Sequence, residues 1–303
     1  MVPSMAFCNY EEIIVAKLGK FFCNFVRFYY AINIIDFVNE SSENSLGEGY
    51  NERAWDEPLV GFSRGDDPYY TWLKQDIGDF HLTPYEIFSK AFPTVESNPS
   101  GLSVICWILP QTEATKADMR AVQKYPSERA ALSRVNGEAF NQKVMQYVVD
   151  VLREHGYEAV APSISEYWGI NMSEKYGIAS TWSDKHVAFI SGLGTFSLTD
   201  ALITEYGSAI RIGSVVSNIP IEATDRKYSK YNEYCLHFSK GGCLKCAERC
   251  PAGAISEKGH DKIKCREYLN SVASKYIDEN YKVDTNFCGL CQFGVPCESC
   301  IPG

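Results

Sequence analysis

The sequence has no excess of positive charge. Its 29 Lys and Arg stand against 38 Asp and Glu, which gives a net charge of −9 and a pI of about 5.2. An acidic chain is poorly suited to hold a phosphate backbone or an anionic lipid surface, because both carry the same sign of charge. We therefore expect neither nucleic acid nor a membrane as a partner, and this also disfavours a tRNA substrate.

Long uncharged apolar runs and targeting signals are also missing. The most apolar early stretch, residues 18–38, is interrupted by charged and amide side chains, whereas a membrane-spanning helix needs about 20 apolar residues in succession. We predict a core helix there. The first 20 residues resemble neither a secretory signal peptide nor a twin-arginine signal, so we expect a cytoplasmic protein.

Cysteine is scarce in the first 234 residues and frequent in the remaining 69. Of the 12 cysteines, nine lie between Cys235 and Cys300. A reducing cytoplasm disfavours a disulfide framework, which leaves metal binding as the role of these thiols. The same region has few Leu, Ile or Val and a charge balance of +1, against −10 over residues 1–234. We predict a domain boundary near residues 222–234, which separates a first domain of residues 1–230 from a second of residues 231–303 that bound metal helps to stabilise.

Hydrophobic patterns upstream of the cysteines predict alternating helices and strands. A helix followed by Gly156 and then a strand is typical of a layered α/β or α+β domain. Residues 39–68 are polar, acidic and rich in Gly and Ser, so we expect a loop. The other predicted elements are a strand over 101–110, a helix over 133–155, a strand over 158–161 and a strand over 209–219 with Ile210, Ile212 and Val216 facing inward.

The spacing of the cysteines indicates iron–sulfur clusters. The first set reads Cys235-x7-Cys243-x2-Cys246-x3-Cys250-Pro251, the second reads Cys288-x2-Cys291-x5-Cys297-x2-Cys300, and Cys265 lies between them. A Cys-x2-Cys-x3-Cys-Pro run is typical of proteins with two cubane clusters. Two clusters need eight thiolates, and nine are present. A single tetrahedral zinc is the alternative, but it would leave five cysteines and the Cys-Pro pair unexplained.

Two segments resemble the epoxyqueuosine reductase-like proteins, relatives of the cobalamin-dependent reductive dehalogenases. The segment CLHFSKGGCLKCAERCPAGAI, followed by KCREYL and CGLCQFGVPCESCIP, resembles their two-cluster module, and WSDKHVAFISGLGTFSLTDALIT resembles their Gly-Leu-Gly region. The likeness covers about residues 100–303. It implies an α+β protein with a nitroreductase-like α/β core domain and a ferredoxin-like module that holds two [4Fe-4S] clusters.

The resemblance also implies how the thiols are shared. In that family the Cys before Pro crosses over to the other cluster. The family's usual first ligand is replaced here by the Lys240-Gly241-Gly242 stretch, so we predict Cys235 as the fourth ligand of one cluster, with Cys300 as its alternative. The two implied sets are Cys250, Cys265, Cys288 and Cys291, and Cys243, Cys246 and Cys297 with this fourth ligand.

A cobalamin site is implied by the resemblance alone. It would lie beside Gly192, Leu193, Gly194 and Thr195, a turn that by itself is more typical of a structural role and does not satisfy the dinucleotide fingerprint. We expect Arg211 to face an anionic cofactor tail or a carboxylate. Glycines in the turn would let a bulky ring approach the backbone.

The implied reaction is a reduction. Low-potential electrons from a donor such as ferredoxin or flavodoxin would pass through both clusters to the cobalamin, which would reduce a small molecule or a modified base. The alternative is a ferredoxin-like electron-transfer or assembly partner without substrate chemistry of its own. A first domain of more than 200 residues favours the enzyme, because a ferredoxin needs no such domain.

The proton donor is an open question in the sequence. Ile178 occupies the position of the family's Asp donor and cannot donate. Our candidates are Asp184, His186, Tyr167 and Tyr176. We favour His186, because an unperturbed imidazole pKa of about 6.5 suits donation near neutral pH, with Asp184 positioning it or pairing with Lys185. We expect the remaining histidines to be structural.

Overall fold

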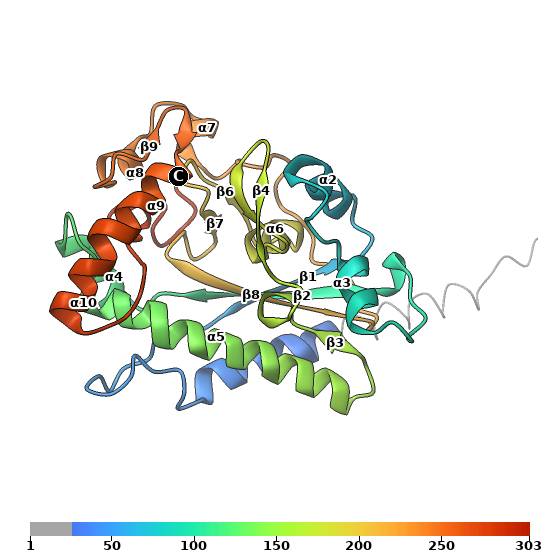
Figure 1. The fold of residues 1–303 in the computed structure, drawn as a ribbon. Helices are drawn as coiled ribbons and strands as arrows, with labels where there is room; N and C mark the ends of the chain where they lie inside the picture. The colour runs from blue at the N-terminus through green and yellow to red at the C-terminus, as the bar shows by residue number, and fades with distance from the viewer. Residues whose placement is uncertain (1–25) are drawn as a thin grey trace, which may run out of the picture.

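The computed structural model describes residues 26–303 and has an α+β architecture with helices on both faces of a small sheet (Figure 1). All pairings in this sheet are antiparallel, and the strand order is β1-β2-β8-β3. The four strands are β1 (Leu59–Arg64), β2 (Ser103–Pro110), β3 (Ala159–Val160) and β8 (Ile210–Ser217). β3 pairs only with Val216 and Ser217, so the first part of β8 has no strand partner on that side within the described residues.

β2 is the central strand, and every one of its eight residues is buried. A strand covered on both faces reads as a continuous apolar run, which is why SVICWILP was recognisable in the sequence. Its side chains alternate between two cores. Val104, Cys106 and Ile108 belong to one core, and Ile105, Trp107 and Leu109 belong to the other.

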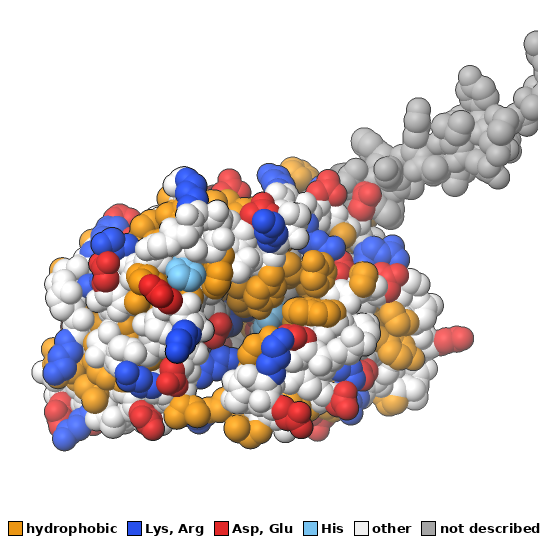
Figure 2. Space-filling view, turned by 90° about the horizontal axis from the view of Figure 1, so that it is seen from above, with side chains coloured by type: hydrophobic (Ala, Val, Ile, Leu, Met, Phe, Trp, Pro, Cys, Tyr) orange, Lys and Arg blue, Asp and Glu red, His pale blue; other side chains and the backbone are white. Residues whose placement is uncertain are grey.

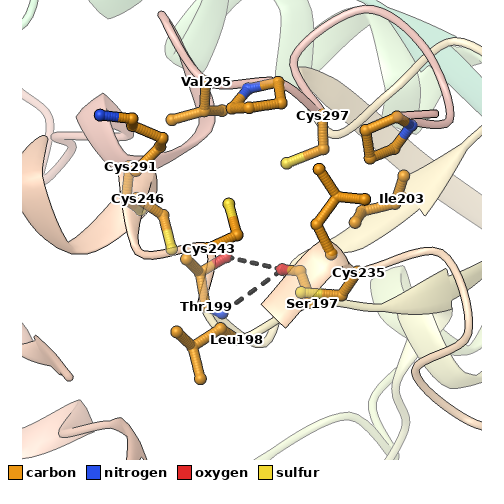
Figure 3. A pocket seen from close by; sticks show the side chains of 14 residues that line it. Ser197, Leu198, Thr199, Ile203, Cys235, Cys243, Cys246, Cys291, Val295 and Cys297 are labelled. Carbon is orange, nitrogen blue, oxygen red and sulfur yellow. Dashed lines mark hydrogen bonds between the residues drawn. The ribbon is translucent and has the colours of Figure 1, made fainter. Parts of the chain in front are cut away.

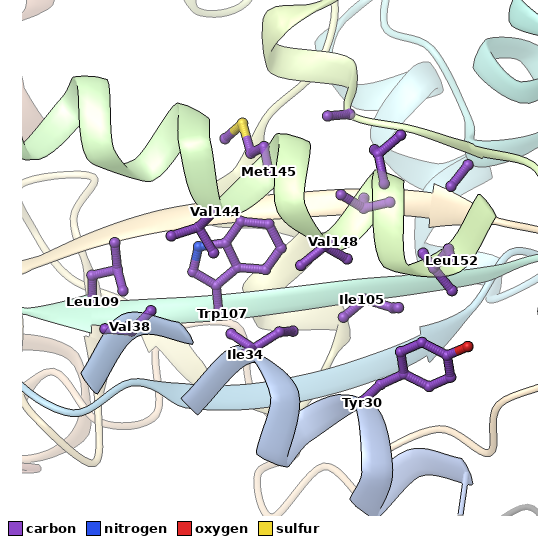
Figure 4. Close-up of a cluster of buried hydrophobic side chains, with 14 of the residues drawn as sticks. Tyr30, Ile34, Val38, Ile105, Trp107, Leu109, Val144, Met145, Val148 and Leu152 are labelled. Atoms are coloured by element: carbon purple, nitrogen blue, oxygen red, sulfur yellow. The ribbon is translucent and has the colours of Figure 1, made fainter. Parts of the chain in front are cut away.

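The second of these cores lies under α5 (Glu128–Glu154) and a helix over residues 26–40 (Figure 4). Trp107 is enclosed between the two helices and the sheet, and its indole Nε1 donates to Asn141 Oδ1 at 2.9 Å. Ser127 caps the N-terminus of α5, and its hydroxyl accepts from the amide of Ala130. Gly156, in the left-handed region with φ +84°, follows the end of this helix.

The first core is covered by shorter elements on the opposite face. Three helices pack there, and two hairpins extend from this side (Figure 1). The helices are α2 (Pro68–Ile77), α3 (Pro84–Ala91) and α6 (Asp184–Ile190). The hairpins are β4 (Ile170–Ser173) with β5 (Gly177–Ser180), and β6 (Gly194–Phe196) with β7 (Leu202–Thr204).

Most predicted elements are confirmed. The strands predicted over 101–110, 158–161 and 209–219 are β2, β3 and β8, and Ile210, Ile212 and Val216 do share one face. The helix predicted over 133–155 is α5, which begins five residues earlier. The core helix predicted over 18–38 is confirmed for residues 26–38, and its earlier part lies outside the described residues. The loop predicted over 39–68 is wrong for residues 59–64, which form β1.

The cysteine-rich segment is built from short elements. They are α7 (Leu236–Ser239), α8 (Lys245–Glu248), β9 (Ile255–Ser256), β10 (Gly259–His260), α9 (Lys262–Tyr268), a π-helical turn over Leu269–Ala273 and α10 (Ser274–Tyr281). No helix within residues 26–303 is long and apolar enough to cross a membrane. The domain boundary near residues 222–234 stays a prediction.

Arg249 joins the cysteine-rich segment to α4 (Glu113–Ala121). Its guanidinium donates to the carbonyls of Met119 and Val122, both at 2.8 Å, and to that of Phe293 at 3.0 Å. A second link is the buried carboxylate of Glu298, which accepts from Arg120 at 2.6 Å. These charge-assisted bonds hold the residue before Cys250 in a fixed place on the first part of the chain.

Candidate cluster sites and cofactor cavity

Five cysteines line one small space, and we call four of their thiols the first thiol group. They are those of Cys235, Cys243, Cys246 and Cys297, and Figure 3 shows their sulfurs on different sides of the space. Gly241 and Gly242 both have positive φ, a conformation that glycine adopts readily and that turns the chain between Cys235 and Cys243. Burial and the three neighbouring thiols raise the pKa of Cys246 to about 12.

The other four predicted ligands line a much larger cavity, and we call them the second thiol group. They are those of Cys250, Cys265, Cys288 and Cys291. Burial raises the pKa of Cys288 to about 11, with Cys265 and Cys250 contributing. Cys291 lines both spaces, so the two thiol groups are neighbours.

Each of the two ligand sets that the resemblance implies lines a common space, and Cys291 lines both spaces. Cys235 stands with the first group, whereas Cys300 is exposed and its thiol points to the carbonyl of Pro296 at 3.9 Å. No three His, Cys, Asp or Glu side chains of residues 26–303 gather tightly enough to bind a single metal ion. Eight soft thiolate donors, arranged as two fours around two spaces, fit two cubane clusters.

The large cavity has a volume of about 760 Å³. Its walls come from the second thiol group, from one face of α5, from the unpaired part of β8, from α6 and from the β4–β5 hairpin. Figure 2 shows it as a hollow with hydrophobic side chains along its rim. Cavities of this size hold cofactors and drug-sized ligands. A redox cofactor bound here would lie directly beside the second thiol group.

His186 lies in the cavity wall and is held by two hydroxyls. Its Nδ1 is 2.8 Å from Ser183 Oγ, and its Nε2 is 3.1 Å from the hydroxyl of Tyr231. Burial holds the pKa of His186 well below its usual range, and the positive charges of Lys185 and Lys262 add to this. His186 is therefore neutral near pH 7, and our reason for favouring it as the acid is wrong.

Asp184 also lines the cavity, but its partners differ from those predicted. The carboxylate accepts from Ser214 at 2.5 Å, from Ser163 at 2.6 Å and from Trp182 Nε1 at 3.3 Å. Lys185 donates instead to the carbonyl of Asp200 at 2.8 Å. The prediction that Asp184 positions His186 or pairs with Lys185 is therefore wrong. Burial raises the pKa of Asp184, which favours its protonated form.

Of the other two predicted donors, one lines the cavity and one does not. Tyr176 and Ile178 line the cavity, and the Tyr176 hydroxyl donates to Asp76 at 2.6 Å. Tyr167 is not among the lining residues and donates to the carbonyl of Lys90 at 2.9 Å. Tyr231, which the sequence analysis missed, does line the cavity, and burial raises its pKa. Tyr231 lies in no recognisable sequence motif. Only its contact with His186, 45 residues away in the sequence, identifies it as a candidate donor.

The Gly-Leu-Gly turn is placed away from the cavity. A Cβ at Gly194 would lie 2.2 Å from the carbonyl oxygen of Ile203, so this glycine is required for the close approach of β6 and β7. Leu193 is buried, and the hydroxyl of Thr195 accepts from the amide of Tyr234 at 2.9 Å. None of the residues 192–195 is among those that line the cavity. Their placement gives no support to the predicted cobalamin contact, because these glycines make room for the protein's own backbone.

Arg211 does line the cavity, where it forms an ion pair with Glu138. Arg211 was expected to face either an anionic cofactor tail or a carboxylate, and the structure shows the carboxylate of Glu138. Burial, with the charge of Arg134 adding to it, lowers the pKa of Arg211 to about 9. The histidines expected to be structural include His81 and His260, which also line the cavity.

Fold and site together define an α+β protein with two four-thiol sites, one of which opens on a cofactor-sized cavity. No family model matches the chain. The epoxyqueuosine reductase of Listeria monocytogenes is 32% identical over 102 residues, which make up 33% of this chain and 24% of the relative. The tetrachloroethene reductive dehalogenase of Desulfitobacterium hafniense is 30% identical over 118 residues, 38% of this chain and 20% of the relative.

A solved epoxyqueuosine reductase, bound to a modified tRNA stem loop, aligns with 89% of this chain and 66% of its own at 18% identity and a TM-score of 0.46. By the sequence matches, the chain is a distant relative of epoxyqueuosine reductases and reductive dehalogenases, and the resemblance found in the sequence is confirmed. The matched segments span 24% and 20% of these two relatives.

Proposed function

We propose that this chain is an iron–sulfur reductase with two [4Fe-4S] clusters and a cobalamin in the large cavity, acting on a small molecule or a modified base. The observation that carries the proposal is the second thiol group in the cavity wall, because electrons stored there are adjacent to any bound cofactor. Cobalamin is the cofactor that the distant relationship suggests, and when bound it would supply a low-potential metal centre for reductive bond cleavage.

The thiol groups would have different tasks. The pocket of the first group includes the exposed Lys245, and this group would receive electrons from a ferredoxin or flavodoxin. Cys291, which lines both spaces, brings the second group close enough to take them on. Arg249 holds the chain next to Cys250 on the first part of the chain through the carbonyls of Met119 and Val122.

The proton would come from Tyr231. A phenol is protonated at neutral pH, so the Tyr231 hydroxyl has a proton to donate. His186, neutral and held by Ser183, orients this hydroxyl through the 3.1 Å contact. Phe196 stacks on the Tyr231 ring with centroids 4.4 Å apart, which fixes the plane of the phenol. Asp184 also lines the cavity, and burial raises the pKa of its carboxyl group.

The test is anaerobic purification followed by titration with cobalamin. We expect the visible spectrum of two [4Fe-4S] clusters, stoichiometric cobalamin binding and reduction of bound cobalamin when the clusters are reduced. Clusters without any cofactor binding would instead identify an electron carrier, and binding of flavin in place of cobalamin would contradict the cofactor assignment.

Single-turnover reduction then separates the donors. Tyr231→Phe should slow the proton-dependent step by about 10²-fold or more, and His186→Gln should slow it less, because it only removes the orienting contact. Tyr167→Phe is the matched control, since its hydroxyl lies outside the cavity wall. If Asp184→Asn abolished the proton-dependent step and Tyr231→Phe kept the parent rate, Asp184 would be the proton donor instead of Tyr231.

A further inference from the structure

Two arginines of the cavity wall share one carboxylate. Arg134 and Glu138 lie one turn apart on the same face of α5, and Arg211 reaches them from β8. Arg211 forms an ion pair with Glu138, and Arg134 Nη1 lies 3.8 Å from the same oxygen, Glu138 Oε2. A single negative charge therefore faces two positive charges, and one positive charge is left over.

Both guanidiniums present their remaining surface to the cavity. Their side chains are 35% and 31% accessible, and both residues line the cavity. Burial lowers the pKa of Arg134, as it does for Arg211. The folded protein thus keeps two cations where water is limited, an arrangement that a bound anion would stabilise.

The polar neighbours on this wall already have partners within the protein. Ser133 donates to Gln111 Oε1 at 3.1 Å, and Asn141 accepts from Trp107 and donates to the carbonyl of Ile212 at 3.1 Å. Across residues 26–303, Arg134 makes no hydrogen bond beyond its long contact with Glu138. The guanidinium N–H groups are therefore the donors that this part of the wall offers to a ligand.

We propose that Arg134 and Arg211 form an oxyanion subsite that binds a phosphate ester or a carboxylate of the cavity's ligand. Two planar guanidiniums suit the several oxygens of such a group, and each can donate two bonds to it. A purely structural ion pair between α5 and β8 would need only Arg211 and Glu138, and it leaves Arg134 unexplained.

The anion has two possible sources with the same chemistry. One is the phosphodiester in the nucleotide tail of cobalamin, and this alternative rests on the proposed function. The other is an acidic group on the substrate. Cobinamide lacks the nucleotide tail and its phosphodiester, so it separates the two sources, and inorganic phosphate probes the subsite without any cofactor.

The experiment measures binding of inorganic phosphate, cobalamin and cobinamide to the cluster-containing full chain by titration calorimetry. The variants are Arg134→Gln, Arg211→Gln and Glu138→Gln, with Arg153→Gln on the same helix but outside the cavity as the matched control. Unchanged cluster spectra show that each variant is folded. We expect phosphate binding to weaken about tenfold in each arginine variant, to strengthen in Glu138→Gln and to stay the same in Arg153→Gln.

The titrations with cobalamin and cobinamide then identify the source of the anion. Weaker binding of cobalamin with unchanged binding of cobinamide assigns the subsite to the phosphodiester, whereas arginine-dependent phosphate binding with unchanged cobalamin binding assigns it to the substrate. Phosphate and cobalamin affinities that are alike in the parent and both arginine variants would overturn the subsite. Failure of the parent chain to bind cobalamin would overturn the proposed cofactor, and phosphate would still decide the subsite.

Discussion

The sheet and the cysteine-rich segment are stabilised in different ways. The sheet lies between two large apolar cores that its own helices cover. The core beside the first thiol group contains four buried residues, and two of them, Leu198 and Ile203, come from the β6–β7 region of the first part of the chain. The cysteine-rich segment therefore packs on an apolar surface of the first part of the chain, and we expect bound clusters to add to its stability.

The largest expected effect is loss of one cluster at a time. Cys246→Ser, in the first thiol group, and Cys265→Ser, in the second, should each reduce iron and sulfide from about eight to about four per chain, because each removes a thiolate from one set of four. Chemical analysis of anaerobically purified protein measures this. Loss of all iron from either variant would show that the two sites do not form independently, and zinc in place of iron would contradict the cluster assignment.

The next effect concerns the sheet. Trp107→Ala removes a fully buried indole and its bond to Asn141, which should lower the free energy of unfolding by about 3–5 kcal/mol. Denaturant unfolding followed by circular dichroism measures the change. Iron content at low denaturant should stay the same. A loss of iron that parallels the loss of stability would show that the two regions unfold as one unit.

A smaller effect is expected from His186. Since the fold lowers its pKa below 6.5, the unfolded chain binds this proton first as the pH falls, and the free energy of unfolding decreases below about pH 6.5. The contribution is at most about 1.4 kcal/mol per pH unit. His186→Gln should remove it, whereas His81, whose pKa burial also lowers, keeps its own contribution. Denaturant unfolding between about pH 7.5 and 5.5 compares the slopes, and equal slopes would contradict a neutral His186.

The smallest effect should come from Cys300→Ser. Cys300 is exposed and lines neither thiol space, so both clusters and the stability should be unchanged within about 0.5 kcal/mol. Iron analysis and denaturant unfolding provide the measurements. Loss of about four irons would make Cys300 a ligand in place of Cys235, and Cys235→Ser would then keep its full iron content.

The sequence could predict what local pattern determines. A fully apolar strand such as β2 and the helical spacing of α5 are visible without a structure. The spacing of the cysteines indicated iron–sulfur clusters, and the family resemblance divided the thiols into two sets of four. β1 could not be predicted, because LVGFSR lies in a polar region and only its pairing with β2 makes it a strand.

The rest of the site depends on contacts between distant residues. Tyr231 meets His186, and Arg134 meets Arg211, only after the chain has folded. The pKa of His186 moves because of burial, which a residue type does not reveal. The Gly-Leu-Gly turn was over-interpreted from the sequence. Its motif suggested contact with a ligand, whereas Gly194 allows the close approach of the backbone at Ile203.

Arg249 holds the cysteine-rich segment against the end of α4 through the carbonyls of Met119 and Val122. The next residue, Cys250, is part of the cavity wall. The contacts that secure the segment therefore also close the cavity on this side, and their loss would detach the segment and open the cavity together.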